Sequence, residues 1–312
     1  MRVDAHRSSK LLLCLAAVYF LWGSSFLFTK IAVASLPPAM FSGLRFIAAG
    51  LLLTLIARLY GGDRLPTSAL EWRHLTIAGF FMVFVSNGLN TWAIQYIPSN
   101  QSALLNATSA FWIAGLGIFG PKGHPLTRRS LTGLIIGFLG AALMLVPHGR
   151  LSTASLLAQV AVLGACLGWA LGTLYYRSIE TRISPLLFMG LQMCMGGLML
   201  LCLGFAHGDI ARWSPDTSSI VAMSYLTLCS SCLAYTAYGW LTLNCTPAMI
   251  GTYSYVNPAI AAFMGWWFLH EQLSATQLAG MVIIIIGVCT LTLRGPGGRV
   301  DPKEPPPAKR SA

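Results

Sequence analysis

One uncharged stretch near the C-terminal end constrains the fold more than any other feature of the sequence. It runs from Ala248 to Leu269 and ends abruptly at His270 and Glu271. At about 1.5 Å of helical rise per residue, it can cross a hydrocarbon core of about 30 Å. Several similar stretches follow one another along the chain, and only 9% of the 312 residues are charged, against about 25% in soluble domains. We therefore expect an all-α, multi-pass membrane protein, because a membrane β-barrel would alternate apolar and polar residues.

The apolar stretches predict ten transmembrane helices with short connections. Their expected ranges are residues 11–34, 38–59, 72–97, 98–119, 130–147, 155–177, 185–206, 218–242, 246–268 and 274–294. Residues 1–10 form an N-terminal tail, and residues 295–312, rich in Pro, Gly and charge, form a disordered C-terminal tail. Of the 20 Lys and Arg residues, 16 lie in the tails and the even-numbered connections. The positive-inside rule then places both termini in the cytoplasm. We expect the membrane to be a bacterial inner membrane.

The two halves of the chain repeat each other at a shift of 147 residues. Trp22 then coincides with Trp169 (169 − 22 = 147), and Arg45 with Gln192. The other coincidences are Pro38 with Pro185, Phe41 with Phe188, Gly50 with Gly197, Gly133 with Gly280, and Gly140 with Gly287. Each copy, residues 11–147 and residues 155–294, holds five helices, so the second copy enters the membrane from the opposite side. We expect two inverted repeats, the arrangement that many carriers use for alternating access.

The ninth predicted helix carries polar and aromatic groups near its middle. They are Tyr253, Ser254, Tyr255 and Asn257, and Pro258 follows them. Proline removes a backbone hydrogen bond, so we expect a helix break that acts in gating and that faces protein or a water-filled cavity. The alternative is a kinked helix that only packs against its neighbours.

Other predicted helices place polar or aromatic side chains at similar depth. The candidate substrate-binding residues are Trp22, Arg45, Asn87, Asn90, Thr91, Trp169, Tyr235, Tyr238, Tyr255 and Asn257. Polar groups that face lipid are costly, so these side chains should face inward, some joining helices and others lining a cavity. Such a cavity suits a small neutral, zwitterionic or amphipathic organic solute.

Charged groups inside the membrane are almost absent from the sequence. Arg45 is the only basic residue well inside a helix, and it either binds a substrate carboxylate or snorkels to the surface or to neighbouring carbonyls. None of the nine acidic residues lies at mid-membrane, and Glu271, a gating candidate, adjoins a helix end. This distribution argues against a proton relay of buried carboxylates, while a sodium site built from backbone carbonyls stays open.

The sequence contains no pattern that predicts catalysis, a cofactor or a metal. The histidines are scattered at helix ends, and Cys229 and Cys232 lie in an apolar stretch where thiols pack. The net charge of +11 comes from basic residues at helix ends and in the tail, which argues against nucleic acid as a partner. The expected partners are a small solute and the lipid bilayer, with a homodimer as one option.

Four stretches resemble the EamA-type family of the drug/metabolite transporter superfamily, and in particular its YedA-like members. They are LWGSS at 21–25, PAMFSGLR at 38–45, GWA at 168–170, and PAMIGTYSYVNP from 247 through to Glu271. The resemblance implies export of metabolites, amino acids or drugs through a central cavity, with Trp22, Arg45, Tyr255, Pro258 and Glu271 at matching positions. The first half departs from the family pattern at Ile94, at Ala110 and in residues 121–124.

The leading hypothesis is an inner-membrane secondary transporter that exports small organic metabolites, amino acid-like or amphipathic and drug-like, by alternating access. A flippase-like carrier of lipid-linked groups is an alternative, although it would need a charged cavity that opens sideways to lipid. A membrane scaffold or sensor without transport is the other alternative, and the inverted repeat argues against it.

Overall fold

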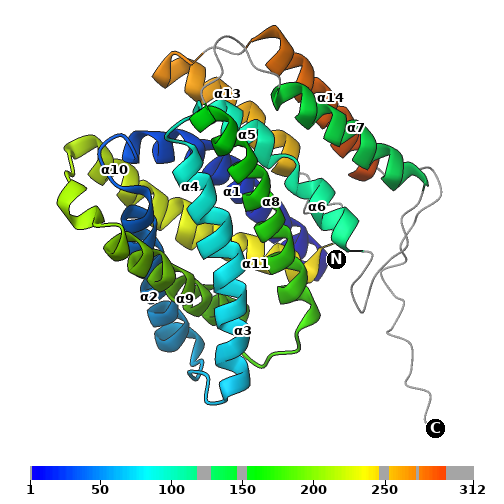
Figure 1. Ribbon diagram of the computed structural model, residues 1–312. Helices are drawn as coiled ribbons and strands as arrows, with labels where there is room; N and C mark the ends of the chain where they lie inside the picture. The colour runs from blue at the N-terminus through cyan, green and yellow to red at the C-terminus, as the bar shows by residue number, and fades with distance from the viewer. Residues whose placement is uncertain (1, 118–127, 146–152, 246–252, 272–273, 293–312) are drawn as a thin grey trace.

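A computed structural model describes residues 2–117, 128–145, 153–245, 253–271 and 274–292. Every regular element within these ranges is a helix (Figure 1). The first half contains α1 (Arg2–Ala32), α2 (Pro38–Gly61), α3 (Ala69–Gly79), η1 (Phe80–Asn87), α4 (Gly88–Ala93), α5 (Ser99–Asn106), α6 (Ser109–Leu116) and α7 (Arg128–Leu145). The second half contains α8 (Thr153–Ser178), α9 (Pro185–Ala206), η2 (Asp209–Arg212), α10 (Thr217–Tyr225), η3 (Leu226–Ala234), α11 (Tyr235–Asn244), α13 (Tyr253–Leu269) and α14 (Ala275–Thr292).

Six helical segments among the described residues are long and apolar enough to cross a membrane. They are Ser9–Ala32, Pro38–Gly61, Ala69–Ala93, Thr153–Ser178, Pro185–Ala206 and Thr217–Asn244. Shorter apolar helices cover Leu131–Gly140, Val256–Leu269 and Leu278–Gly287. The expectation of an all-helical, multi-pass membrane protein is confirmed. The first helix begins at Arg2, so residues 2–10, expected as a tail, are helical, whereas the tail 295–312 lies outside the described residues.

Two of the long segments contain a π-helical stretch in the middle. Figure 1 shows α3 and α4 as parts of one rod, with η1 between them, and η3 likewise joins α10 to α11. The two π-helical stretches begin at Phe80 and Leu226, 146 residues apart (226 − 80 = 146), which is within one residue of the repeat shift. A π-helical turn redirects backbone carbonyls away from the regular ladder and is frequent at functional sites.

The predicted single helix 98–119 is wrong, because the chain divides into α5 and α6. At the division, Thr108 Oγ1 donates to the Leu105 carbonyl at 2.7 Å, and Ser109 Oγ donates to the Asn106 carbonyl at 2.6 Å. Side chains that bond back to the preceding turn compete with the helical ladder. The predicted break at Pro258 differs too, since α13 continues from Tyr253 to Leu269 with Pro258 inside it.

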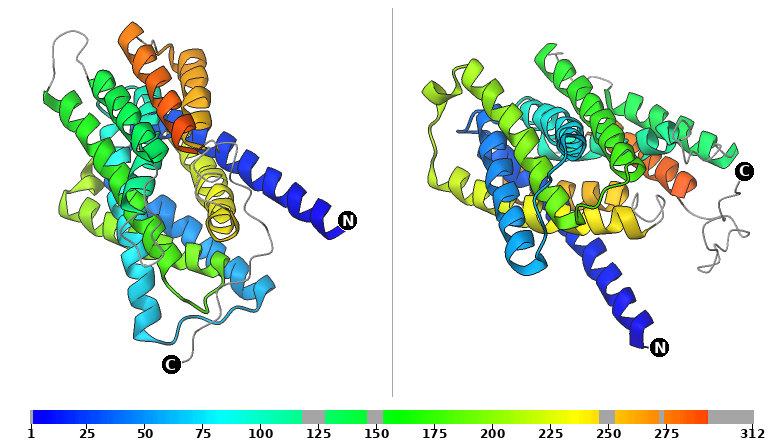
Figure 2. Two further views of the ribbon diagram at one scale, coloured as in Figure 1. Left: turned by 90° about the vertical axis from the view of Figure 1, so that its right-hand side faces the viewer. Right: turned by 90° about the horizontal axis from the view of Figure 1, so that it is seen from below.

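The first helix of each half packs among helices of the other half. Helix α1 contacts α13, α10, η3 and α11, while α8 contacts η1, α4, α5 and α6. The beginning of α1 projects from the bundle in both views of Figure 2. The two halves therefore interleave, and any space at the centre is lined from both.

Helices α2 and α9 meet through glycines that contact each other crosswise. A methyl group on Gly50 would lie 2.5 Å from the Gly190 carbonyl oxygen, and one on Gly43 would lie 2.9 Å from that of Gly197. At the shift of 147, Gly190 is the repeat partner of Gly43, and Gly197 is that of Gly50. Each glycine thus contacts the repeat partner of the other, as residues do across a two-fold axis.

Helices α7 and α14 meet through the same crosswise pattern of glycine contacts. A methyl group on Gly140 would lie 2.9 Å from the Gly280 carbonyl oxygen, and one on Gly287 would lie 2.9 Å from that of Gly133. Gly280 and Gly287 are the repeat partners of Gly133 and Gly140, so the crosswise pattern holds in two separate helix pairs.

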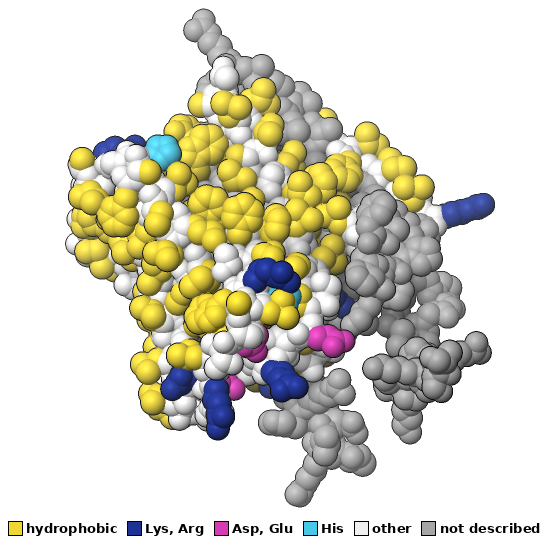
Figure 3. All heavy atoms as spheres, turned by 60° about the horizontal axis from the view of Figure 1, so that its bottom comes forward, with side chains coloured by type: hydrophobic (Ala, Val, Ile, Leu, Met, Phe, Trp, Pro, Cys, Tyr) yellow, Lys and Arg dark blue, Asp and Glu magenta, His cyan; other side chains and the backbone are white. Residues whose placement is uncertain are grey.

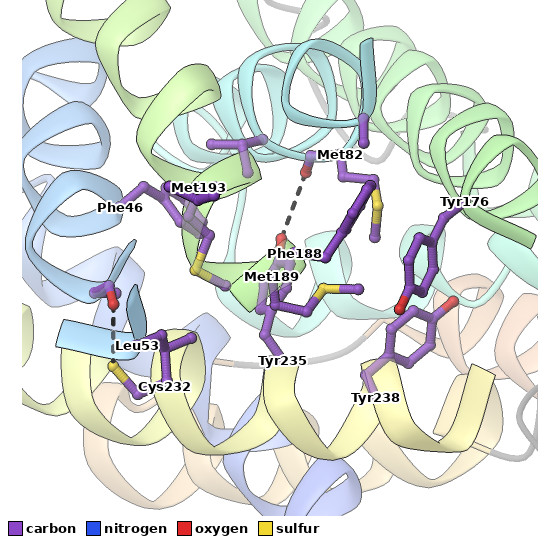
Figure 4. Packing of buried hydrophobic residues seen from close by; sticks show 14 of the residues in the cluster. Phe46, Leu53, Met82, Tyr176, Phe188, Met189, Met193, Cys232, Tyr235 and Tyr238 are labelled. Atoms are coloured by element: carbon purple, nitrogen blue, oxygen red, sulfur yellow. Dashed lines mark hydrogen bonds between the residues drawn. The ribbon is translucent and has the colours of Figure 1, made fainter. Parts of the chain in front are cut away.

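Apolar side chains fill the interior and also cover most of the outer surface. The largest buried cluster joins α2, η1, α9 and α11 and includes Phe46, Met82, Phe188, Met189 and Tyr235 (Figure 4). Figure 3 shows broad apolar areas on the outer surface, with several Lys and Arg side chains in the lower part of the view and others at its upper left and right edges. This distribution is expected for a protein whose sides face lipid and whose ends face water.

Candidate functional site

Five aromatic rings meet at the centre of the bundle. They belong to Trp22 in α1, Trp169 in α8, Tyr235 and Tyr238 in α11, and Tyr253 in α13. Trp22 lies with its ring centroid 5.3 Å from that of Trp169, 5.0 Å from that of Tyr238 and 5.6 Å from that of Tyr253. Most of these contacts are edge to face, the arrangement that aromatic quadrupoles favour. Rings from both halves of the chain thus form one wall.

A cavity of about 100 Å³ lies against this aromatic wall. One water molecule needs about 10–15 Å³ measured in this way, so the cavity holds several waters or a small organic group. The lining residues come from both halves and are Trp22, Ser25, Phe26, Thr29, Arg45, Ser86, Asn87, Asn90, Thr91, Ala103, Asn106, Ala107, Ser109, Trp169, Ser230, Tyr235, Tyr253, Ser254, Asn257 and Pro258.

Arg45 brings the only charge to this lining among the described residues. Its side chain is 4% exposed, so it does not snorkel to the surface. Nη2 donates to Asn87 Oδ1 at 3.4 Å, Nε has no hydrogen-bond partner, and the guanidinium carbon lies 4.2 Å from the centre of the Phe46 ring. The guanidinium carbon also lies 5.7 Å from the centre of the Phe41 ring, so the charge is held by one long hydrogen bond and two aromatic rings.

These contacts do not balance the cost of burying the charge. Removing an ion from water costs several kcal/mol even after the protein relaxes. Each of the two cation–π contacts returns about 0.5–2 kcal/mol, the longer one towards the lower figure, and a hydrogen bond as long as 3.4 Å adds little. In proteins such a charge is usually paired with an acid, but none of the described lining residues is acidic.

Two further contacts fix the orientation of the Asn87 amide, whose oxygen accepts the hydrogen bond from Arg45. Its Nδ2 donates to the Met82 carbonyl at 2.7 Å and to the Tyr235 hydroxyl at 2.6 Å. The Tyr235 hydroxyl in turn lies 3.4 Å from the Met82 carbonyl, as the dashed line in Figure 4 shows. Because both acceptors lie on the amide nitrogen side, the amide oxygen must point towards Arg45. The π-helical turn of η1 provides the carbonyl that sets this orientation.

Several buried polar atoms at the cavity have no hydrogen-bond partner among the residues that the structure describes. They are Arg45 Nε, Trp169 Nε1, Ser254 Oγ and Asn257 Oδ1. Pro258 has no N–H, so the Ser254 carbonyl four residues earlier also lacks its helical donor. Nearly all buried polar groups in proteins find a partner, so these atoms are positioned to bind water or a solute.

Asn90 joins helices at one side of the cavity. Its Oδ1 accepts from Ser102 Oγ at 2.9 Å and from Asn106 Nδ2 at 2.8 Å, which ties α4 to α5. Trp22 is also anchored, since its Nε1 donates to the Ser230 carbonyl in η3 at 3.2 Å. Both side chains therefore hold helices together as well as lining the cavity.

Lys30 and Glu271 hold the corner between α4 and α5, residues 94–100. Lys30 Nζ donates to the carbonyls of Ile94, at 2.7 Å, and of Ile97, at 2.9 Å. Glu271 accepts from Ser99 N at 2.7 Å, from Ser99 Oγ at 2.8 Å and from the backbone N–H of residue 100 at 3.1 Å. A cation at a helix C-terminus and an anion at a helix N-terminus are both favourable. We call this arrangement the Lys30–Glu271 clamp.

The structure brings most of the predicted site residues together at the cavity. Those that line it are Trp22, Arg45, Asn87, Asn90, Thr91, Trp169, Tyr235, Asn257 and Pro258. Tyr238 belongs to the aromatic wall but does not line the cavity; it is fully buried, and its hydroxyl lies 3.1 Å from Thr173 Oγ1. The Tyr255 side chain lies outside the described part of the structure, and Glu271 lies in the clamp.

Sequence reasoning left some lining residues out of the candidate set. They include Ser25, Thr29, Ser86, Ser230, Tyr253 and Ser254. Ser254 and Tyr253 precede Pro258 and could have been chosen from the same polar stretch, whereas isolated serines in an apolar helix give no distinct signal. Among the described residues, no group of three or more His, Cys, Asp or Glu side chains is placed to hold a metal ion.

Comparison with known proteins identifies the family. The model of the EamA-like transporter family matches this chain twice, at residues 9–146 and at residues 156–293. The chain belongs to the EamA-like transporter family. This EamA-like protein is 32% identical over 281 residues to the uncharacterized inner membrane transporter YedA of Escherichia coli K12, with 89% of each chain covered.

Other comparisons extend the likeness of this EamA-like protein. It is 26% identical over 286 residues to the uncharacterized transporter YvbV of Bacillus subtilis 168, covering 90% of this chain and 91% of that one. A probable amino-acid metabolite efflux pump of Salmonella typhimurium LT2 is 24% identical over 281 residues, with 87% and 91% covered. A solved crystal structure of a protein matches with a TM-score of 0.67 at 16% identity, covering 91% of this chain and 98% of that chain, which shows a shared fold.

Proposed function

We propose that this EamA-like protein is an inner-membrane secondary transporter that exports small organic solutes by alternating access. The observation that carries the proposal is the cavity, which both halves of the chain line and which contains buried polar atoms without protein partners. Amino acid-like and amphipathic solutes suit its mixture of aromatic wall and hydrogen-bonding groups. The efflux of amino-acid metabolites that the name of the Salmonella relative states agrees with this choice.

The proposed architecture is ten membrane-spanning helices in two oppositely inserted copies of five. The crosswise glycine contacts in α2–α9 and α7–α14 support it, because a two-fold axis relates residues in that manner. The nearly equivalent positions of η1 and η3 support it further. An axis in the membrane plane and the distribution of Lys and Arg would place both termini in the cytoplasm.

In this orientation the Lys30–Glu271 clamp lies at the external end of the bundle. It joins the end of α1 and the end of α13 to the α4–α5 corner, so its release would let the cavity open outwards. The residue equivalent to Glu271 in the first copy is His124 (271 − 147 = 124), which removes the acid from the corresponding cytoplasmic position. We propose that the external and cytoplasmic ends of the bundle close through different contacts. Pro258, which lacks a backbone N–H, would let α13 bend locally during these changes.

The two alternative functions fit the cavity less well. A flippase for lipid-linked groups would need a charged lining, whereas Arg45 is the only charged residue among the described lining residues. A scaffold or sensor has no use for buried polar atoms that lack partners and face a shared cavity, because each of them costs stability.

Counterflow in vesicles tests the proposal. Purified protein is reconstituted into liposomes loaded with a panel of amino acids and amphipathic drugs, and uptake of each labelled solute is followed. We expect the labelled form of at least one loaded solute to accumulate above protein-free liposomes. If no solute exchanges faster than in protein-free liposomes, with or without a proton or sodium gradient, the transporter proposal is wrong.

A further inference from the structure

The guanidinium of Arg45 lacks the partner that a buried cation requires. It faces the central cavity, its Nε has no hydrogen-bond partner, and its one hydrogen bond goes to a neutral amide. Asn87 is itself held by Met82 and Tyr235, so it cannot move closer without breaking those bonds. The protein thus keeps Arg45 buried, charged and incompletely bonded beside the central cavity.

We propose that the missing partner is a carboxylate of the solute, so that the cavity selects small organic solutes that carry a carboxylate group. This inference rests on the proposed function, because it assumes that the central cavity is the solute site. Guanidinium groups bind carboxylates through two parallel hydrogen bonds, and a free Nε together with a terminal nitrogen offers that geometry. Trp169 Nε1, also without a partner at the same cavity, is a neutral donor for the solute.

Hydrogen-bond acceptors, rather than donors, lie beside another part of the cavity. Ser254 Oγ and Asn257 Oδ1 are buried acceptors without partners, and Pro258 leaves the Ser254 carbonyl without its helical donor. Acceptors of this kind suit an ammonium group, while the aromatic wall suits an apolar side chain. An amino acid would use both parts of the cavity, and a simple carboxylic acid would use only the Arg45 part.

The competing explanation is that Arg45 only stabilises the fold through Phe41, Phe46 and Asn87. Two substitutions separate these explanations. Arg45→Gln removes the charge and keeps hydrogen-bonding capacity, whereas Asn87→Asp supplies a permanent carboxylate next to Arg45 that would compete with the solute. The Tyr235 hydroxyl can donate to this new carboxylate, so the position keeps a hydrogen bond.

The experiment compares matched ligands on the full-length protein in detergent and in liposomes. For alanine, leucine, phenylalanine and glutamine, the ligands are the amino acid, its amide, its decarboxylated amine and its deaminated carboxylic acid. Thermal stabilisation reports binding, and counterflow reports transport. Arg58→Gln is the control, because Arg58 is an exposed residue of the same helix, α2.

We expect acids to bind more tightly than their amides and amines by about 10- to 100-fold, the range that a charge-assisted hydrogen bond supplies. Arg45→Gln and Asn87→Asp should both abolish this preference, and Arg58→Gln should retain it. Binding of the deaminated acids would show that the carboxylate suffices, and binding of the amino acids alone would show that the acceptor side contributes as well.

Three results would overturn the inference. Equal affinity for acids and amides in the unmodified protein would do so without any variant, as would a preference that survives in Asn87→Asp. Transport of amines or amides with no acid bound would contradict the inference while leaving the proposed function intact. Acid-selective binding without counterflow would support the site and contradict transport.

Discussion

The indole rings of Trp22 and Trp169 lie edge to face, with their centroids 5.3 Å apart and their planes at 86°. The two residues occupy equivalent positions in the two copies of the repeat, so a residue and its repeat partner meet at the centre of the bundle. Their hydrogen bonding differs, because Trp22 Nε1 donates to the Ser230 carbonyl and Trp169 Nε1 has no partner. One indole is therefore anchored by a hydrogen bond, and we propose that the N–H of the other binds the solute.

This difference predicts opposite effects for the same substitution. Trp22→Phe should lower the free energy of unfolding by about 1 kcal/mol more than Trp169→Phe, because only the former loses a hydrogen bond. Trp169→Phe should instead reduce solute binding with little change in stability beyond that of the smaller ring. Unfolding in detergent and thermal-shift binding measure the two quantities. Equal stability losses with equal binding losses would contradict the assignment.

The glycine contacts of α2 predict which helix interfaces accept a methyl group. Gly50→Ala should destabilise the protein by about 1–3 kcal/mol, because the added methyl would meet backbone atoms of α9 that cannot move away cheaply. Gly164→Ala is the matched control, since its methyl would lie 3.4 Å from Leu89 Cδ1, an ordinary contact. Unfolding in detergent provides the comparison. A Gly50→Ala protein as stable as Gly164→Ala would show that the α2–α9 contact is looser than described.

The Lys30–Glu271 clamp predicts an effect on access to the cavity. Glu271→Gln replaces one acceptor oxygen by a donor that would face the N–H groups of α5, so the clamp should open more often. In a background without native cysteines, a cysteine at Thr29, which lines the cavity, should react faster with a membrane-impermeant thiol reagent added outside. Glu180→Gln, at an exposed connection, is the control. Unchanged labelling in Glu271→Gln would argue against a gating role.

Asp216 predicts a pH dependence at the start of α10. Hydrogen bonds from the Ser219 backbone N–H, the Ser219 hydroxyl and the Ser218 hydroxyl hold the pKa of the Asp216 carboxyl below its ordinary value. The ionised form is therefore favoured in the folded state, and its stabilisation is present above the unfolded pKa of about 3.9. It is lost as the pH falls through the lower folded pKa. Asp216→Ala should lower the melting temperature at pH 7, and the difference from the unmodified protein should shrink below pH 4. A difference that is constant with pH would contradict this reasoning.

The central cavity could be largely predicted because depth in a membrane can be read from sequence. Arg45, Asn87 and Asn257 are polar groups far from the ends of apolar stretches, and the cost of exposing them to lipid places them inside. The same reasoning placed Tyr238 with them, yet that side chain lies one layer behind the cavity. The cost of lipid exposure predicts that a polar side chain faces the interior of the bundle, but it does not predict how far from the central cavity the side chain lies.

Other features depend on specific contacts that the hydrophobic periodicity of the sequence does not predict. Lys30 lies near the end of a predicted helix, and its hydrogen bonds to the carbonyls of residues 94, 95 and 97 depend on the folding of distant segments. The division between α5 and α6 comes from back-bonding by Thr108 and Ser109, which are compatible with a continuous helix in sequence. The helix through Pro258 continues because one missing hydrogen bond inside a packed bundle costs less than a break.

The opposite insertion of the two copies is tested most directly by labelling two equivalent positions. Thr67 and Ser214 are repeat partners (214 − 67 = 147), and both are exposed in connections between helices. In a background without native cysteines, the account predicts that Ser214→Cys reacts with a membrane-impermeant thiol reagent in intact cells. Thr67→Cys should react only after the membrane is opened. Labelling of both positions from the same side would contradict the inverted repeat.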